Sequence, residues 1–258
     1  VNVKSSAENR LKFRESLFSA NGMSKYIGGV ILYDETIRQS TNSGLDICEL
    51  IKKSGSIPGI KVDTGAKTLA GSPKEKITEG LDGLRDRLKE YYKLGARFTK
   101  WRGVYSITNS LPSKLCIVAN AHALARYAAL AQEANMVPIV EPEVLMDGDH
   151  NIDVCFKVTC EVLKVCYEQL NLHNIDLVGT ILKPNMILPG KDCKKKETGE
   201  KIAELTLKCL QNSVPKEVPG IAFLSGGQTE IEATKNLNLI NKVNKTNFIM
   251  SFSYGRAL

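Results

Sequence analysis

Polar and charged side chains occur in pairs, two residues apart, at the ends of several apolar segments of this 258-residue chain. The pairs are Lys61/Asp63, Lys100/Arg102, Glu141/Glu143, Lys183/Asn185 and Ser251/Ser253. Because side chains alternate across a β-strand, the two members of each pair share a face. If the segments are neighbouring strands, a lysine amine lies among carboxylates and other cations. Such a cluster is suited to attack by the amine on a carbonyl group, with a carboxylate moving the protons.

Ordinary salt bridges between strands are the alternative interpretation of these pairs. One isolated pair would fit that interpretation as well as a functional one. Several pairs at corresponding strand ends favour a functional site, because an unpaired buried charge costs several kcal/mol and a packed interior gains nothing from it.

Two glycine-containing segments are suited to binding anions. Leu224–Gln228 (Leu-Ser-Gly-Gly-Gln) ends a predicted strand and enters a predicted helix, so backbone N–H groups and the helix N-terminus can line a phosphate. Ser253–Arg256 (Ser-Tyr-Gly-Arg) follows the last predicted strand, where arginine can hold a phosphate through two hydrogen bonds. Either segment alone is typical of a turn. Together they indicate the phosphate site that the last two strands of α/β barrels often provide.

Short apolar segments alternate with amphipathic helical segments along the whole chain, which is typical of a parallel sheet with helices outside it. The predicted strands are Tyr26–Tyr33, Pro58–Asp63, Arg97–Val104, Val137–Glu143, Thr180–Asn185, Gly220–Gly226 and Asn247–Ser253. The predicted helices are Gly80–Leu94, Ser113–Ala134 with Pro112 at its first position, Asp153–Leu170, Thr198–Asn212 and Thr229–Asn241. Since the polar residues lie at strand ends, where barrels hold their active sites, we expect a closed α/β barrel forming one domain over residues 1–258.

Composition argues against several other classes of protein. No run of about 18 apolar residues occurs and the segment Val1–Arg14 is charged, so neither a membrane span nor a signal peptide is expected. The net charge of +7 is dense only at Lys191–Lys196, so a nucleic-acid partner is not expected. Seven cysteines without a C-x-x-C motif favour reduced, mostly buried thiols and a cytoplasmic location. Three scattered histidines do not make a metal-ligand set, so we expect no metal and no other cofactor.

From about Glu8 to Leu258 the chain resembles the class I, Schiff-base-forming fructose-1,6-bisphosphate aldolases. The segments that carry the resemblance are IGGVIL, GIKVD, EGLDGL, KWR, ARYA, PIVEPE, DGDH, LKPNM, FLSGGQ, NLN, IN and FSYGRAL. The resemblance implies a (β/α)8 TIM barrel. The family's first strand and its C-terminal tail have no counterpart in residues 1–258, so we expect this chain to be part of a longer one. Val178 stands where the family usually has Glu, at a position expected to face away from the chemistry.

The resemblance also implies a role for individual residues. Lys183 is expected to form the imine with the ketose, Glu141 to serve as general acid and base, and Glu143 and Lys100 to support their charges. The phosphate beside the imine is expected at Ser225, Gly226, Gly227, Ser253, Gly255 and Arg256. Lys61 and Arg102 are expected to bind the second phosphate. The implied reaction is the reversible glycolytic cleavage of fructose 1,6-bisphosphate to dihydroxyacetone phosphate and glyceraldehyde 3-phosphate.

Two other functions stay open at this point. The first is a Schiff-base lyase for a smaller substrate, which would share Lys183 but not the two phosphate sites. The second is a non-catalytic adaptor that uses basic surface to bind acidic protein segments, such as cytoskeletal tails. The resemblance further implies a homotetramer, and it leaves the preference between fructose 1,6-bisphosphate and fructose 1-phosphate undecided.

Overall fold

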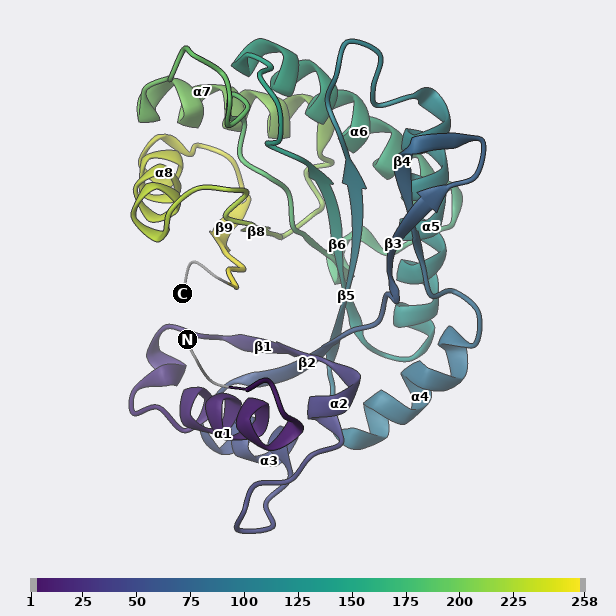
Figure 1. Cartoon of the computed structure of the whole chain (residues 1–258), viewed down its shortest axis with the longest axis vertical. Coiled ribbons are helices and arrows are strands. Elements are labelled where there is room, and N and C mark those ends of the chain that lie inside the picture. The colour runs from purple at the N-terminus through teal and green to yellow at the C-terminus, as the bar shows by residue number, and fades with distance from the viewer. Residues whose placement is uncertain (1–3, 256–258) are drawn as a thin grey trace. The chain divides into compact units, whose positions relative to one another are not determined.

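The computed structural model describes residues 4–255, which form two compact units (Figure 1). Unit 1 comprises residues up to Val62 together with Asp82–Lys100 and Leu130–Val137. Unit 2 comprises Asp63–Leu81, Trp101–Ala129 and the chain from Pro138 onward. The expectation of a single domain over residues 1–258 stays a prediction.

Unit 1 contains a short parallel sheet with helices. Its elements are α1 (Ala7–Phe18), the 3-10 helix η1 (Met23–Lys25), β1 (Gly29–Leu32), α2 (Asp34–Ile37), α3 (Ile47–Lys53), β2 (Ile57–Lys61), α4 (Leu84–Leu94) and the start of β5 (Phe98–Tyr105). The strand order in this unit is β1-β2-β5, and both pairings are parallel. The register sets Lys61 opposite Lys100. Both lysines of the predicted site on these strands therefore belong to unit 1.

Helix α4 illustrates how the sequence pattern produces the elements of unit 1. The sequence places Leu81, Leu84, Leu88 and Tyr91 on one stripe of the predicted helix. The helix begins only at Leu84, so Leu81 lies outside it, while Leu84, Leu88 and Tyr91 are buried on one face. The helix ends at Gly95, whose φ of 114° favours glycine and whose N–H donates to the carbonyls of Tyr91 and Tyr92. Burial of this stripe, rather than intrinsic helix propensity, anchors α4.

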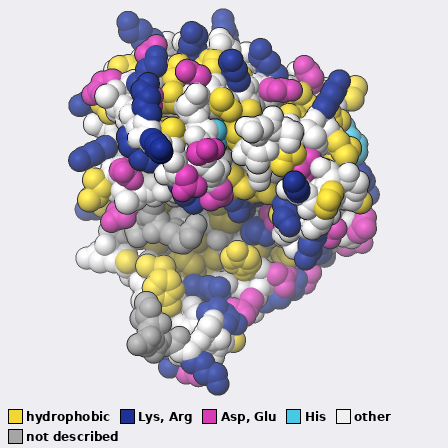
Figure 2. Space-filling view, turned by 45° about the horizontal axis from the view of Figure 1, so that its top comes forward, with side chains coloured by type: hydrophobic (Ala, Val, Ile, Leu, Met, Phe, Trp, Pro, Cys, Tyr) yellow, Lys and Arg dark blue, Asp and Glu magenta, His cyan; other side chains and the backbone are white. Residues whose placement is uncertain are grey.

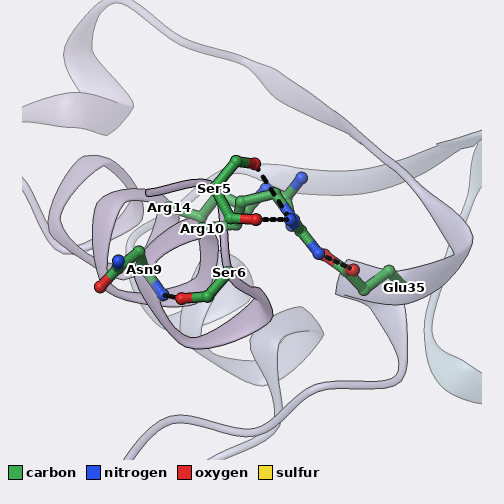
Figure 3. Close-up of polar contacts among 6 residues, drawn as sticks. All are labelled: Ser5, Ser6, Asn9, Arg10, Arg14 and Glu35. Atoms are coloured by element: carbon green, nitrogen blue, oxygen red, sulfur yellow. Dashed lines mark hydrogen bonds and ion pairs between the residues drawn. The ribbon is translucent and has the colours of Figure 1, made fainter. Parts of the chain in front are cut away.

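A carboxylate on α2 connects that short helix to α1 (Figure 3). Glu35 accepts hydrogen bonds from Arg10 at 2.6 and 3.0 Å and from Arg14 at 2.9 Å. The guanidinium of Arg10, followed by that of Arg14, lowers the pKa of Glu35 to about 2. Ser6 caps α1 by accepting the N–H of Asn9, which fixes the first turn of the helix.

Unit 2 holds the remaining strands and the longer helices. Its elements are the hairpin β3 (Gly65–Leu69) and β4 (Ser72–Glu79), the end of β5, α5 (Lys114–Glu133), β6 (Val137–Val144), α6 (Ile152–Leu172), the 3-10 helix η2 (Leu177–Gly179), β7 (Ile181–Leu182), α7 (Gly199–Ser213), β8 (Gly220–Phe223), α8 (Glu230–Val243) and β9 (Ile249–Phe252). The strand order is β5-β6-β7-β8-β9, and the three pairings from β6 to β9 are parallel. Helices α6, α7 and α8 lie on the outer side of these strands (Figure 1).

Trp101 marks the layer between strand and helix in unit 2. Its side chain is fully buried and stacks on Tyr127 of α5, with ring centroids 5.6 Å apart. Since Trp101 lies between Lys100 and Arg102 on β5, strand alternation predicts that it points away from their face, and its burial against α5 confirms a core role.

All seven predicted strands are present, although most are shorter than expected. The sequence did not predict the β3–β4 hairpin or helices α1, α2 and α3. The sequence predicted Pro112 at the first position of α5, and this prediction was wrong, because the helix begins at Lys114. Ser113 precedes the helix and caps it, since its hydroxyl accepts the N–H of Cys116, and Pro112 lies one residue earlier.

The face of the molecule seen in Figure 2 carries charges of both signs. Lys and Arg side chains lie among acidic and apolar ones over the face seen in Figure 2. Within residues 4–255, every helix is too short or too polar to span a lipid bilayer.

Candidate active site

Lys183 and Glu141 form a buried pair in unit 2. The register of β6 and β7 pairs Ile139 with Ile181 and Val140 with Leu182, so the next two residues, Glu141 and Lys183, are neighbours across the strands. The N–H of Lys183 donates to the carbonyl of Val140 at 2.8 Å, which continues the pairing. The Lys183 Nζ atom lies 3.2 Å from Glu141 Oε1, and the two residues are 9% and 3% exposed. The predicted amine and the predicted acid and base are therefore in hydrogen-bonding contact.

Glu143 extends this cluster along β6. Its carboxylate accepts a hydrogen bond from Nε of Arg102, which comes from β5 and is less buried than Glu143. Burial raises the pKa of Glu143, and the charge of Arg102 opposes that shift in part. A carboxyl group with a raised pKa beside Glu141 and a cation adds a second proton-exchanging group to the site.

Asn185 and Asp63, the partners of Lys183 and Lys61 in the sequence pattern, contact backbone atoms. The Asn185 Oδ1 atom accepts the N–H of Val144 at 3.0 Å, and its Nδ2 donates to Thr159 of α6 at 3.2 Å. Asp63 accepts the N–H of Gly65 at 3.1 Å and that of Arg102 at 3.3 Å. Asn185 therefore connects the end of β6 to α6, and Asp63 orients the start of the hairpin and the backbone at Arg102.

The predicted phosphate loop after β8 has the backbone geometry that its glycines suggested. Gly226 and Gly227 have φ values of 51° and 78°, a region that strongly favours glycine. The backbone N–H and the side-chain amide of Gln228 both donate to the carbonyl of Ser225, at 3.0 and 2.9 Å. Directly afterwards, Thr229 and Glu232 form a capping box at the start of α8. The loop therefore faces the positive end of a helix dipole, as an anion site requires.

A cavity of about 610 Å³ opens beside this loop within unit 2. Gly226 and Gly227 line it together with Lys191 and Lys196 of the loop between β7 and α7 and with Lys235 of α8. Two carboxylates, Glu197 and Glu232, also line it. Since neither Lys183 nor Glu141 is among its lining residues, this cavity adjoins the predicted phosphate loop and is not the space around the amine.

The other predicted site residues are distributed over the rest of the chain. Ser253 donates its N–H to the carbonyl of Phe223 at 2.9 Å, and Gly255 follows two residues later. Arg256 lies outside the described residues. In unit 1, Lys100 is buried, while the Lys61 ammonium lies 5.7 Å from the centre of the Tyr33 ring.

Gln228 and Asn236 are site residues that sequence reasoning did not single out. Asn236 of α8 donates to Gln228 Oε1 at 2.7 Å, which holds the Gln228 amide against the Ser225 carbonyl. Gln228 closes the Leu-Ser-Gly-Gly-Gln segment, so the motif contained this signal, but its partner on α8 is visible only after folding. Within residues 4–255, no three His, Cys, Asp or Glu side chains are grouped as metal ligands.

Comparison with known proteins identifies relatives along the whole chain. A family model described as "Glycolytic: Fructose-bisphosphate aldolase class-I" matches residues 1–258. A Xylella fastidiosa (strain Temecula1 / ATCC 700964) protein named "Probable fructose-bisphosphate aldolase class 1" is 52% identical over 258 residues, which cover all of this chain and 77% of that protein. "Fructose-bisphosphate aldolase 4, cytosolic" of Arabidopsis thaliana is 51% identical over 259 residues, covering 100% of this chain and 66% of the relative.

A solved structure supports the same relationship. It is a complex of fructose-bisphosphate aldolase from Plasmodium falciparum with TRAP and a small molecule inhibitor, 45% identical to this chain. The match has a TM-score of 0.98 and covers 100% of this chain and 75% of that one, which confirms the predicted α/β barrel fold. The family match, the relatives and the fold agree with the lysine and carboxylate pair on β6 and β7. This chain therefore belongs to the class-I fructose-bisphosphate aldolase family, lyases that cleave a sugar bisphosphate through a lysine Schiff base.

Proposed function

We propose that Lys183 is the amine that forms the Schiff base in this aldolase and that Glu141 is its acid and base. The observation that carries this proposal is the 3.2 Å separation of Lys183 Nζ from Glu141 Oε1 in a buried environment. At that distance a proton can pass directly between the two groups. A Lys183 amine that has given up its proton is a nucleophile for the ketose carbonyl.

The proposed sequence of steps uses this pair twice. The Lys183 nitrogen adds to the ketose carbonyl to give a carbinolamine, and Glu141 donates the proton that lets the hydroxyl leave as water. Glu141, now ionised, takes the proton of the C4 hydroxyl, the C3–C4 bond breaks, and its electron pair passes into the iminium, which gives an enamine and releases glyceraldehyde 3-phosphate. Proton return to the enamine carbon and hydrolysis of the imine then release dihydroxyacetone phosphate.

The loop after β8 is proposed to bind the phosphate nearest the imine. The support is its backbone, since Gly226 and Gly227 adopt positive φ values immediately before the N-terminus of α8. Ser225, Ser253 and Gly255 are assigned to the same phosphate by their position in the family motifs. Arg102, a partly exposed cation at the edge of the cluster, is proposed to bind the second phosphate. The roles of Lys61, Lys100 and Arg256 stay predictions from the resemblance.

Borohydride trapping tests the assignment of Lys183. The chain is incubated with dihydroxyacetone phosphate, reduced with borohydride, digested and mapped by mass spectrometry. We expect the adduct on Lys183, unchanged by EDTA, and we expect Lys183→Met to remove both the adduct and turnover while keeping the wild-type circular dichroism spectrum. Turnover that persists in the variant contradicts the assignment, and an adduct on another lysine identifies the residue that replaces it.

Location and assembly are proposed separately from the chemistry. We propose a cytoplasmic protein, supported by the word "cytosolic" in the names of two plant relatives, 51% and 50% identical.

We also propose a homotetramer, which light scattering after gel filtration tests against the 28.4 kDa mass of one chain. A protein partner with acidic segments is proposed because the chain carries a net charge of +7 and the Plasmodium aldolase was solved with TRAP bound. A pull-down with an acidic and a charge-reversed peptide tests that partner.

A further inference from the structure

Two cysteines from adjacent helices of unit 2 bring their sulfur atoms into contact. Cys160 lies on α6 and Cys209 on α7, and their Sγ atoms are 3.1 Å apart. Both are free thiols. Since a disulfide bond measures about 2.05 Å, a further approach of about 1 Å joins the two sulfurs. Neither thiol takes part in the chemistry proposed for Lys183.

The two thiols have different surroundings, which separates their chemical roles. Cys160 is 9% exposed, whereas Cys209 is 1% exposed. The contact with Cys209 lowers the pKa of Cys160 to about 7, and the Lys164 ammonium, one turn further along α6, acts in the same direction, while burial opposes both. The same contact, together with burial, raises the pKa of Cys209. These opposite shifts, together with its greater exposure, make Cys160 the more readily ionised of the two thiols.

We propose that Cys160 and Cys209 form a reversible redox pair, in which Cys160 reacts with hydrogen peroxide and Cys209 resolves the product as a disulfide. In the first step the Cys160 sulfur attacks one peroxide oxygen, the O–O bond breaks, and hydroxide leaves and takes up a proton as water. In the second step the Cys209 sulfur attacks the sulfur of the Cys160 sulfenic acid. The S–O bond breaks, and the departing hydroxide takes the Cys209 proton to leave as a second water.

The position of the pair in the fold gives the disulfide a defined effect. Helix α6 connects β6 to β7 and α7 connects β7 to β8, so the segment closed by the disulfide contains Lys183. A cross-link between these helices restrains the unfolded chain, and it stops oxidation of Cys160 before the irreversible sulfinic acid. The oxidised protein is therefore expected to melt several degrees higher than the reduced one.

Peptide mapping tests the proposal directly. The reduced chain is treated with hydrogen peroxide, alkylated and digested with trypsin without reductant. We expect the peptides Val158–Lys164 and Cys209–Lys216 to appear joined, to have lost two hydrogens, and to separate on treatment with dithiothreitol. Neither peptide contains another cysteine. A wild-type protein in which Cys160 is oxidised to sulfinic acid while Cys209 stays reduced overturns the proposal.

Two variants and one variant-free measurement complete the test. Cys209→Ser is expected to leave Cys160 as a sulfenic acid that reacts with dimedone and then advances to sulfinic acid. Cys193→Ser is the matched control, because Cys193 is also 9% exposed, and it is expected to form the cross-link normally. In the native wild type, iodoacetamide is expected to modify Cys160 at least several-fold faster than Cys193 at pH 7. Equal rates at the two cysteines contradict the assignment of Cys160 as the reactive thiol, whether or not the variants fold.

Discussion

The Lys183 Nζ and Glu141 Oε1 atoms lie 3.2 Å apart because their strands pair in parallel register immediately before them. Val140 faces Leu182, and each strand then continues by one residue into a charged side chain. The hydrogen bond from the Lys183 N–H to the Val140 carbonyl, at 2.8 Å, places the two residues side by side at the ends of their strands.

Replacing Glu141 with glutamine tests the proton transfer expected across that separation. Glutamine keeps the size and a hydrogen bond to Lys183 but cannot exchange a proton, so kcat is expected to fall roughly 10²- to 10⁴-fold. Steady-state cleavage of fructose 1,6-bisphosphate measures this loss. Glu133→Gln, an exposed glutamate paired with Arg85, is the control and is expected to retain activity. A Glu141→Gln enzyme within tenfold of wild type assigns the proton transfer to another group.

Arg102→Met tests the site proposed for the second phosphate. Loss of one charge-assisted contact to phosphate, worth about 1.5–3 kcal/mol, raises KM for fructose 1,6-bisphosphate by roughly tenfold or more. KM for fructose 1-phosphate, which lacks that phosphate, is expected to change little. The exposed Arg126 gives the control variant Arg126→Met, with no effect on either substrate expected. An equal increase in KM for both substrates would contradict the phosphate site and would argue that Arg102 acts by positioning Glu143 instead.

Gly226→Ala tests the backbone of the predicted phosphate loop. Gly226 has a φ of 51°, and a Cβ atom there would lie 3.0 Å from Leu224 Cδ1. The left-handed conformation costs a residue with a side chain about 1–2 kcal/mol, so unfolding free energy falls by that amount and the affinity for dihydroxyacetone phosphate weakens. Gly220→Ala in β8 is the control, since its nearest contact is Ile181 Cγ1 at 3.7 Å. Urea unfolding measures the stability of both variants, and titration with dihydroxyacetone phosphate measures their affinity for the ligand. Equal losses in the two variants would indicate a general effect of alanine rather than strain in the loop.

Glu75→Gln tests a carboxylate that holds the hairpin against helix α5. Glu75 is buried and accepts hydrogen bonds from the Ser113 N–H at 2.8 Å and from the Ser72 hydroxyl at 2.7 Å. Burial raises its pKa, but the hydrogen bonds from Ser113 and Ser72 together outweigh that effect, and its net pKa is lowered from the ordinary 4.5. The variant is expected to lose about 1–3 kcal/mol of unfolding free energy at neutral pH.

The pH dependence of that loss has a definite sign. A carboxyl group whose folded pKa is lowered stabilises the protein above its unfolded pKa, and this stabilisation disappears as pH falls through the folded pKa. The difference between wild type and Glu75→Gln is therefore expected to be constant above about pH 5 and to shrink below the ordinary value of 4.5. Urea unfolding at several pH values measures it. If the difference in unfolding free energy between wild type and Glu75→Gln stays constant down to the pH of acid unfolding, the loss of stability comes from packing and not from the charge of Glu75.

Much of the candidate site could be predicted from the sequence because its signals are local. A period of two residues predicts that side chains share a strand face, and Lys183 and Glu141, the first members of two such pairs, lie 3.2 Å apart across β6 and β7. A period of 3–4 residues predicted the buried stripe of α4. Two glycines before a helix start predicted a tight loop after β8, and both adopt positive φ values there.

The hairpin escaped prediction because its residues lack the usual strand signals. Strand β4 (Ser-Pro-Lys-Glu-Lys-Ile-Thr-Glu) is rich in charge, and β3 begins with glycine, so both resemble a loop. The two-residue turn Ala70–Gly71, with Gly71 at a φ of 81°, is the one local signal that could have revealed it. The hairpin is held at the start of α5 by the hydrogen bond from the Ser113 N–H to Glu75, two residues that are 38 positions apart in the sequence.

The sequence by itself determined the alternation of strands and helices and the presence of an amine among carboxylates, because strand and helix periods are properties of neighbouring residues. Only the tertiary structure decided which polar groups meet. Asn185 caps the end of β6 beside Thr159, and the Cys160 and Cys209 thiols, separated by 49 residues, touch across α6 and α7. Such contacts depend on how helices pack on strands, and no local period encodes that packing.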